Sequence, residues 1–530
     1  MAQEDGSGDC PTGPGTGMMA ARTMSSAFAG RSASPLVTTG PRLGTGEVIP
    51  AAVPRTAFGQ GRDGSMARHQ PNQRLGTLLN EAAWNPAELA RAVNDIGKAQ
   101  GLALRYDRTS VAHWLTGSRP RPPVPDLVAS AFSRRTGRLV TVGETGLARP
   151  GRPADDPLLT SGAGTDDIVN RLTVLSRADA DPAGRPRLTD SAYSLDPDAS
   201  PDWRPGRPMP VRPRRTGARV TAAEVRTLQE MSQVFVDLME RYGGAHARSA
   251  LAAYLTDDTS RLLVAPAQAA LRKQLFSGAA QLTHVLARMT MDAGHPSLAQ
   301  RYFTTALGLA HEADDRRLYA ITLRAMSLQA LRLGFHARAR QLADTAVETA
   351  RSSDDPSARA FLLSQRALTH AYASHRRQAV DDLTAAEAQH DRATGPPGPF
   401  SMYPRPGLDY QRGLALLALG DAPQAARALT SSAAARGADR HRSGALTHAR
   451  LAATLLPLGR LEESCVHWHV FLDHYPGLRA APADHALKHL RTSLRGFRDR
   501  PEAAAVLHHA RTVTRPKPAP STDRNTGPAG

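Results

Sequence analysis

Three stretches of the chain align with one another without a gap: AGHPSLAQRYFTTALGLA (293–310), LGFHARARQLADTAVETA (333–350) and ASHRRQAVDDLTAAEAQ (373–389). Alanine recurs in them every forty residues, at Ala299, Ala339 and Ala379 and again at Ala306, Ala346 and Ala386. Self-similarity at a fixed period of this length is typical of stacked helical units. The pattern predicts that this part of the chain is a helical repeat array.

The same spacing continues through two further units, after the insertion GPPGPFSMYPRPG (395–407) lengthens one interval to forty-six residues. Turns are marked by Gly294, Gly334, Ser374, Gly420 and Gly459. Small residues recur where two helices of a hairpin would meet, at Ala287, Ser327, Ala367, Gly413 and Ala452. Larger packing positions are Phe303, Ala343, Leu383, Leu429 and Trp468. We expect five hairpins within 280–498, with DHALKHLRTSLRGF (484–497) as a terminal cap and 219–279 as a helical lead-in.

This pattern resembles the tetratricopeptide repeat in a longer form of about forty residues. The resemblance implies a right-handed superhelical solenoid with a concave groove, because no hairpin can bury its apolar face alone. Repeat phase places five residues on the groove side of the first helix of each hairpin: Arg288, Arg324, Leu328, Tyr372 and Tyr410. We predict that they hold a peptide or protein effector, since Arg and Tyr are frequent interface anchors. The alternatives are that these residues pack on the next repeat, or that the repeats mediate oligomerisation.

A second compact segment, 68–148, carries signals for four short helices. Asn85 and Pro86 begin one helix, Asp107 or Thr109 begins the next, and Gly117 ends it. In that third helix Val111, Trp114 and Leu115 fall on one stripe, which we expect to be buried. Four short helices with tight connections are typical of a helix-turn-helix domain.

The third helix leaves a row of small polar residues on its outer surface, flanked by arginines. Residues 68–149 carry a net excess of basic residues, which favours a polyanionic partner. Side chains of this kind suit base edges in a major groove and backbone phosphates. The predicted DNA-binding residues are Arg105, Arg108, Thr109, Ser110, Ala112, His113, Thr116, Arg119 and Arg121. The alternative is a solvated polar face on an ordinary helical domain.

The segments AELARAVN (87–94) and RTSVAHWLTGSRPRP (108–122) resemble the phage-repressor or Xre type of helix-turn-helix. This sequence differs from that family by about ten extra residues between the second and third helices. Together with the repeats, they resemble actinobacterial (Streptomyces-type) regulators that limit sporulation and antibiotic production. The layout is also similar to peptide-pheromone regulators of Gram-positive bacteria. The resemblance implies a transcriptional regulator, acting as a repressor on double-stranded DNA. The competing interpretation is a protein-interaction scaffold whose N-terminal module does not bind DNA.

Composition supports this division of the 530 residues into an all-α protein with separate parts. Aromatic residues are only 5%, while Lys and Arg exceed Asp and Glu by 66 to 49, giving a net charge of +17. Stretches rich in Gly, Pro and Ser without periodicity predict disorder in three segments. They are an N-terminal extension (1–67), a Pro-rich linker (149–218) and a C-terminal tail, which follows the end of a helix within 499–530. Met66 leaves open an internal start of translation.

The cysteines, the apolar runs and the missing catalytic motifs bear on where the protein acts and on whether it is an enzyme. The two cysteines, Cys10 and Cys465, suggest no disulfide framework, and no apolar run is long enough to span a membrane. We therefore expect a cytoplasmic protein. DNA binding would make it nucleoid-associated, and a two-fold symmetric DNA site would favour a homodimer. Phosphate-loop and HExxH motifs are absent from the sequence, so we predict no enzyme, no catalytic residue and no cofactor. CVHWHVFLDH (465–474) would place only Cys465 and His469 on one helical face, too few for a metal site.

Overall fold

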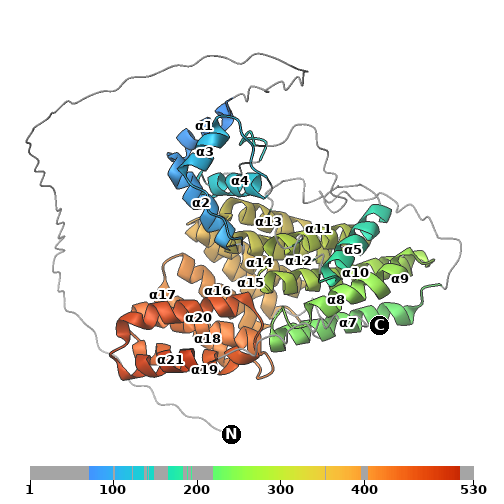
Figure 1. Cartoon of the computed structure of the whole chain (residues 1–530). Coiled ribbons are helices and arrows are strands. Elements are labelled where there is room, and N and C mark those ends of the chain that lie inside the picture. The colour runs from blue at the N-terminus through green and yellow to red at the C-terminus, as the bar shows by residue number, and fades with distance from the viewer. Residues whose placement is uncertain are drawn as a thin grey trace, which may run out of the picture. The chain divides into compact units, whose positions relative to one another are not determined.

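The structure is a computed structural model that describes residues 71–99, 102–121, 123–136, 140, 142–147, 165–182, 185, 188, 193, 219–351, 354–394 and 404–513. Within these residues the chain forms helices joined by turns, without a strand (Figure 1). The predicted all-α class is confirmed. The predicted disordered extension, most of the predicted linker and the tail after residue 513 lie outside the described residues.

Four short helices form between residues 72 and 136, and side-chain caps begin three of them. They are α1 (Gln73–Glu81), α2 (Pro86–Ala99), α3 (Arg108–Leu115) and α4 (Val124–Thr136). Asn85 and Glu88 accept each other's backbone N–H at 3.0 and 2.8 Å, and Asp107 and Ser110 form a second reciprocal cap. Such caps satisfy N–H groups that have no partner within the helix. The predicted starts at Asn85 and Asp107 are confirmed.

The apolar faces of these four helices share one core. Its members include Leu75, Leu78, Leu89, Val93, Val111, Trp114, Leu127 and Phe132. Trp114 is 4% exposed, whereas Leu115, predicted to lie on the same buried stripe, is only half-buried. Eight residues separate α2 from α3, and Asn94 bridges this connection by bonding the Tyr106 N–H and C=O at 2.9 and 2.8 Å.

The prediction of a linker without regular structure over 149–218 is wrong for one segment. Helix α5 (Thr165–Ala180) forms there and packs against α8 and α11 of the repeat region. Its Leu172 and Leu175 are buried, and its Asp179 accepts hydrogen bonds from the Arg248 guanidinium and the Tyr302 hydroxyl at 2.5 and 2.8 Å. The segment contains no proline, and its apolar residues recur at helical spacing. The high proline content of its flanks concealed this pattern.

Five helical hairpins follow, as the repeat spacing predicts. They pair α10 (Ala269–Asp292) with α11 (Pro296–Glu312), α12 (Arg316–Arg332) with α13 (His336–Thr349), α14 (Pro356–Tyr372) with α15 (Arg376–Asp391), α16 (Arg405–Ala418) with α17 (Ala422–Ala434), and α18 (His441–Leu455) with α19 (Leu461–His474). The predicted turn residues all have positive φ, from +60° at Ser374 to +92° at Gly294. We call the first helix of each hairpin an inner helix. The first of them begins at Ala269, before the predicted repeat boundary at 280.

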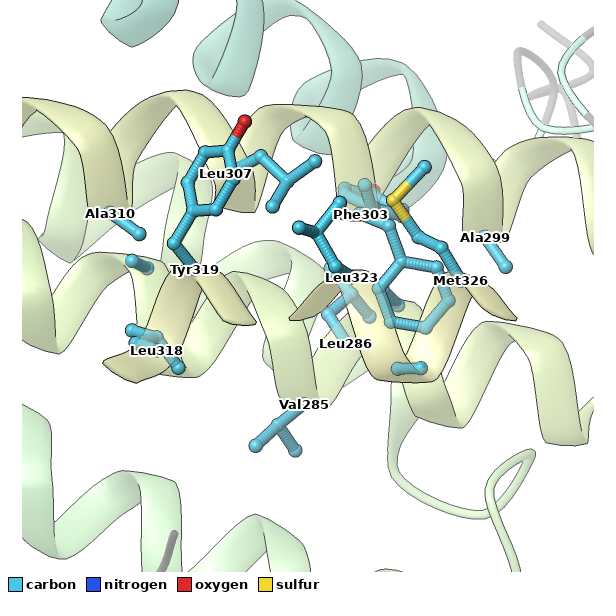
Figure 2. Packing of buried hydrophobic residues seen from close by; sticks show 14 of the residues in the cluster. Val285, Leu286, Ala299, Phe303, Leu307, Ala310, Leu318, Tyr319, Leu323 and Met326 are labelled. Carbon is cyan, nitrogen blue, oxygen red and sulfur yellow. The ribbon is translucent and has the colours of Figure 1, made fainter. Parts of the chain in front are cut away.

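The small residues on the inner helices allow close approach within each hairpin. The Ser327 hydroxyl donates to the Ala339 carbonyl at 2.7 Å, and Ser464 donates to Ala452 at 2.8 Å. Larger side chains fill the spaces between hairpins: Figure 2 shows Phe303 of α11 among Leu286, Leu323 and Met326. Phe303 is fully buried. The predicted pattern of small and large packing positions is confirmed here.

Additional helices lie at both ends of the repeats. The lead-in forms α7 (Ala222–Tyr242), α8 (Arg248–Tyr254), a π-helical turn (Leu255–Thr259) and α9 (Ser260–Val264). The predicted cap forms α20 (Ala481–Ser493) with a 3-10 turn (Leu494–Phe497). The sequence was expected to hold only a helix end after residue 499, yet α21 (Pro501–Thr512) is a further helix that packs on α19.

Helix α7 contacts both the first and the last inner helix, α10 and α18. The Arg442 guanidinium of α18 pairs with Asp292 of α10 at 2.5 Å and lies 3.7 Å from Glu240 of α7. Beside this contact, the Arg479 N–H donates to the Tyr242 carbonyl at 2.7 Å. A Cβ on Gly243 would lie 2.7 Å from the Arg479 carbonyl oxygen, so only glycine fits this position. The inner helices and α7 thus surround a common space, where the sequence predicts the concave groove of a superhelix.

Candidate functional sites

The outer surface of α3 is the first candidate site. Eight of the nine predicted DNA-binding residues are exposed, and Ser110 is half-buried. Val111 and Trp114 are turned into the core on the opposite side of the helix. The exposed residues are Arg105, Arg108, Thr109, Ala112, His113, Thr116, Arg119 and Arg121. Arg108 is the first residue of the helix, and the other three arginines lie in the segments that flank it.

Local bonds occupy two of the polar groups on this surface. The Ser110 hydroxyl donates to the Asp107 carboxylate at 2.7 Å, and the Thr116 hydroxyl donates to the His113 carbonyl at 2.9 Å. Hydrogen bonds from Ser110, first from its backbone and then from its side chain, lower the pKa of Asp107. A charged carboxylate therefore caps the N-terminus of α3. The carboxylate disfavours a phosphate at this N-terminus, so the arginines are the stronger candidates for phosphate contacts.

The second candidate site is a cavity of about 550 Å³ inside the repeats. Helices α7, α10, α12, α14, α16 and α18 line it, together with Arg436 from the segment after α17. All five residues predicted for the effector groove are among its lining residues: Arg288, Arg324, Leu328, Tyr372 and Tyr410. They come from four different inner helices, so the repeat phase correctly indicated that they share one space.

The cavity has a strongly cationic lining. Six arginines contribute to it and neither Asp nor Glu does: Arg288, Arg324, Arg332, Arg436, Arg442 and Arg450. Four of these arginines, Arg332, Arg436, Arg442 and Arg450, are not among the predicted groove residues, although the repeat spacing contained the signal for Arg332 and Arg450. Arg332 stands forty residues before Tyr372, and Arg450 stands thirty-nine residues after the lining residue Gln411.

Two of the predicted groove residues also make contacts within the cavity wall. The Arg324 guanidinium lies 3.5 Å from the centre of the Phe361 ring, and its Nε donates to the Phe361 carbonyl at 3.0 Å. The guanidinium carbon of Arg436 lies 5.7 Å from the centre of the Tyr410 ring. The sequence left open the alternative that the groove residues pack on the neighbouring repeat. Arg324 does so in part, because it contacts Phe361 of the next inner helix. Cation–π stacking of this kind fixes the orientation of a guanidinium.

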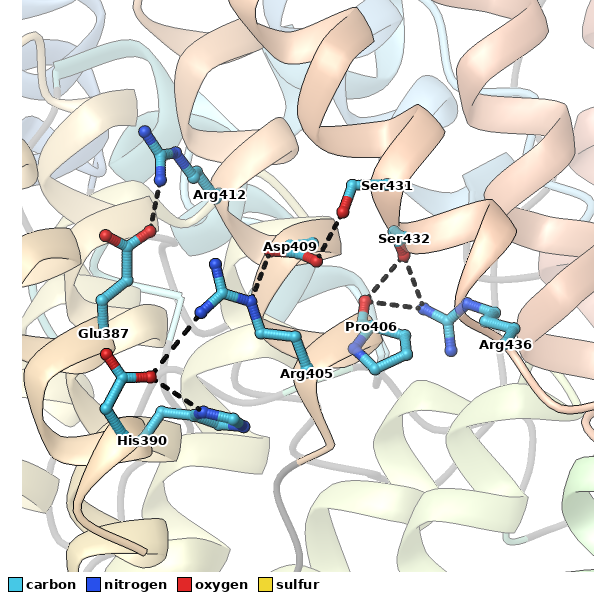
Figure 3. A network of polar contacts seen from close by, with 10 residues as sticks. Glu387, His390, Arg405, Pro406, Asp409, Arg412, Ser431, Ser432 and Arg436 are labelled. Carbon is cyan, nitrogen blue, oxygen red and sulfur yellow. Dashed lines mark hydrogen bonds and ion pairs between the residues drawn. The ribbon is translucent and has the colours of Figure 1, made fainter.

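A polar network supports the same wall between α16 and α17, as Figure 3 shows. The Ser432 hydroxyl donates to the Pro406 carbonyl at 2.6 Å, and Arg436 donates to the same carbonyl at 3.4 Å. The Arg405 guanidinium donates to Asp409 at 3.1 Å, and the Ser431 hydroxyl donates to this carboxylate at 3.0 Å. These bonds hold the start of α16, and therefore Tyr410, in place.

Charge and burial set the protonation of the cavity lining. Burial opposes the charged form of Arg442, but the adjacent Asp292 carboxylate raises its pKa overall. Burial lowers the pKa of Arg288 and of Arg332. Burial also lowers the pKa of His284 well below its usual range, and the charges of Arg288 and Arg324 add to this effect. His284 is therefore a neutral polar group at neutral pH, and the arginines supply the positive charge.

The histidine-rich stretch 465–474 forms pairs with histidines of neighbouring helices. The Nδ1 atoms of His467 and His448 lie 3.0 Å apart, and those of His469 and His509 lie 3.1 Å apart. Cys465 is buried, and burial raises its pKa to about 11. In the part of the chain that the structure describes, no group of three or more His, Cys, Asp or Glu side chains is arranged to hold a metal ion.

None of the described helices combines the length and the apolar character needed to cross a membrane.

Comparison with known proteins adds one finding. Residues 75–148, which contain the four short helices, match the model of a family described as the SP15 N-terminal domain. No curated protein and no solved structure matches the chain.

Proposed function

We propose that this chain is a sequence-specific DNA-binding transcriptional regulator, in which residues 72–147 form a helix-turn-helix domain and the hairpins form a tetratricopeptide-like array that binds an effector. The observation that carries the proposal is the arrangement of α3. Val111 and Trp114 are buried, while all but one of the predicted contact residues are exposed, among them four arginines. An exposed helix with short polar side chains and flanking cations suits the major groove of a duplex.

The resemblance to actinobacterial regulators favours repression of developmental or secondary-metabolite genes. A homodimer would match an operator with two-fold symmetry. The cavity lined by the five predicted groove residues gives the effector a place to bind. Effector binding would change DNA affinity only if the effector prefers one of two arrangements of the chain.

The test is DNA binding measured as a function of salt. Duplexes selected from a random pool by the full chain would serve in gel-shift titrations. Arg119→Ala and Arg121→Ala should each weaken binding and lower the slope of log affinity against log salt by about one, because each removes one phosphate contact. Arg427→Ala, an exposed arginine of α17, is the matched control and should leave the slope unchanged.

The competing function is a protein-interaction scaffold without DNA binding. The local bonds of Ser110 and Thr116 favour it, because these hydroxyls already have partners within the helix. Failure to enrich any duplex from the random pool, at low salt and with the folded chain, would support the scaffold. Enrichment that the double arginine variant leaves intact would retain DNA binding but reject these two phosphate contacts.

A further inference from the structure

A circle of helices surrounds the cavity inside the repeats, which remains partly open to solvent. Neighbouring hairpins join the inner helices in chain order, and α7 bridges the last of them, α18, to the first, α10. The seam is held by the buried Asp292 carboxylate, which accepts from the Arg442 guanidinium and from the Gly244 N–H at 2.8 Å. An extended peptide needs a groove that is open along its length, which this seam interrupts. A volume of about 550 Å³ instead lies within the range of small-molecule sites.

Positive charge in this space exceeds what the nearby carboxylates can neutralise. Asp292 and Glu240 stand beside the cavity, and both are engaged by Arg442. The guanidinium groups of three further lining arginines, Arg288, Arg332 and Arg450, form no hydrogen bond or ion pair with the other described residues. Burial penalises the charge of Arg288 and of Arg332, so an anion between them would relieve an unfavourable arrangement.

The remainder of the lining is apolar and lies beside the arginines on the same helices. Leu328, Leu368 and Leu414 recur at one position of successive inner helices, the position that Arg288 occupies on the first. Leu331, Leu417 and Leu446 add to this apolar surface. Cations and aliphatic side chains in one cavity are complementary to a molecule with an anionic head and an apolar body.

We propose that this cavity is the binding site of a small amphiphilic anion, such as a medium-chain carboxylate, whose head lies between Arg288, Arg332 and Arg450 and whose body contacts the leucines. The guanidinium fork binds carboxylates through paired, charge-assisted hydrogen bonds. The proposal deepens the proposed function by naming the class of effector. Its role as an effector rests on that function, whereas binding itself does not.

The test uses the full chain and an environment-sensitive anionic probe, 1-anilinonaphthalene-8-sulfonate, whose fluorescence rises in an apolar site. Decanoate, decanol and decyltrimethylammonium share one chain length and differ in head-group charge. Decanoate should displace the probe at a concentration about ten-fold or more below that of decanol, because hydrogen bonds to a charged group are strong. Decyltrimethylammonium should be the weakest competitor.

The double variant Arg332→Gln plus Arg450→Gln tests the location. Both side chains keep solvent-accessible surface where they line the cavity, and neither guanidinium has an ion-pair partner to lose among the described residues, so the variant should keep its helical circular dichroism and its melting temperature without ligand. It should lose the preference for decanoate over decanol. Arg427→Gln on the outer surface should keep the preference. Equal displacement by decanoate and decanol would overturn the proposal, as would a preference that survives in the double variant.

Two further outcomes separate this proposal from the proposed function. If decanoate binds as expected but the chain enriches no duplex, the cavity site stands and the regulator does not. If the chain binds DNA, while an unstructured peptide displaces the probe and none of the three decyl compounds does, the regulator stands and the small-anion site is rejected.

Discussion

Arginine lies in two different settings in the two main regions of this molecule. On α3 and its flanks, Arg105, Arg108, Arg119 and Arg121 are exposed on the outside of a small helical domain. In the repeats, six arginines face inward onto one cavity. The two proposed partners follow from this difference: a long polyanion for the outer surface and a small anion for the cavity. Charge counted from the sequence does not distinguish the two settings, because it does not tell whether an arginine faces outward or into a cavity.

The largest effect predicted from this comparison concerns charges that are buried and paired. Arg442→Ala would leave Asp292 uncompensated in the interior, and we expect a loss of about 3–5 kcal/mol in unfolding free energy. The corresponding change on the α3 surface, Arg108→Ala, should alter stability by about 0.5 kcal/mol or less. Urea denaturation followed by circular dichroism measures both. Equal losses would show that the contrast between the two regions is mistaken.

A second prediction compares the packing of the two regions through glycine. A Cβ on Gly413 of α16 would lie 2.7 Å from Leu429 Cγ, whereas a Cβ on Gly76 of α1 meets no atom within 4 Å. Gly413→Ala should therefore cost about 1–3 kcal/mol through overpacking. Gly76→Ala should stabilise the protein by about 0.5–1 kcal/mol, because alanine loses less backbone entropy in a helix. Thermal melts should show a lower melting temperature for Gly413→Ala and a higher one for Gly76→Ala. A shift of both melting temperatures in the same direction would contradict the comparison.

Acid should destabilise the repeats through a histidine pair. Burial, and then the neighbouring His467, lower the pKa of His448 from 6.5 to about 4. The unfolded chain takes up this proton first, so stability should fall as the pH drops from about 6.5 toward 4. His448→Gln should flatten this part of the profile, measured as urea midpoints at intervals of pH. An unchanged slope in the variant would show that other groups carry the acid response.

The smallest effect concerns the turns within the repeats. Ser374 has φ +60° at a position where the other four hairpins have glycine. Ser374→Gly should stabilise by about 0.5 kcal/mol, since relief of the left-handed conformation exceeds the entropic cost of glycine only slightly. Gly420→Ser is the reverse change at an open turn and should cost about 1 kcal/mol. Melting temperatures of the two variants should move in opposite directions.

Local features of the fold were predictable because they depend on neighbours in the sequence. The caps at Asn85 and Asp107 and the positive φ at the repeat turns follow from short-range hydrogen bonding and backbone sterics. Repeat phase also brought the five groove residues to one cavity, since equivalent positions of stacked hairpins face the same side. Prediction failed at α5, where a composition dominated by its proline-rich flanks hid a helical pattern in 165–180.

The sequence by itself therefore determined the helical class, the period of the hairpins and the side of each inner helix that faces the cavity. Only the tertiary structure decided that the array closes. Its seam joins Asp292 to Arg442, which lie 150 residues apart, and depends on the close approach of Gly243 to Arg479. No periodic pattern encodes such a contact, because it arises from the accumulated rotation between successive hairpins. That closure turns a row of arginines and leucines into the lining of one cavity.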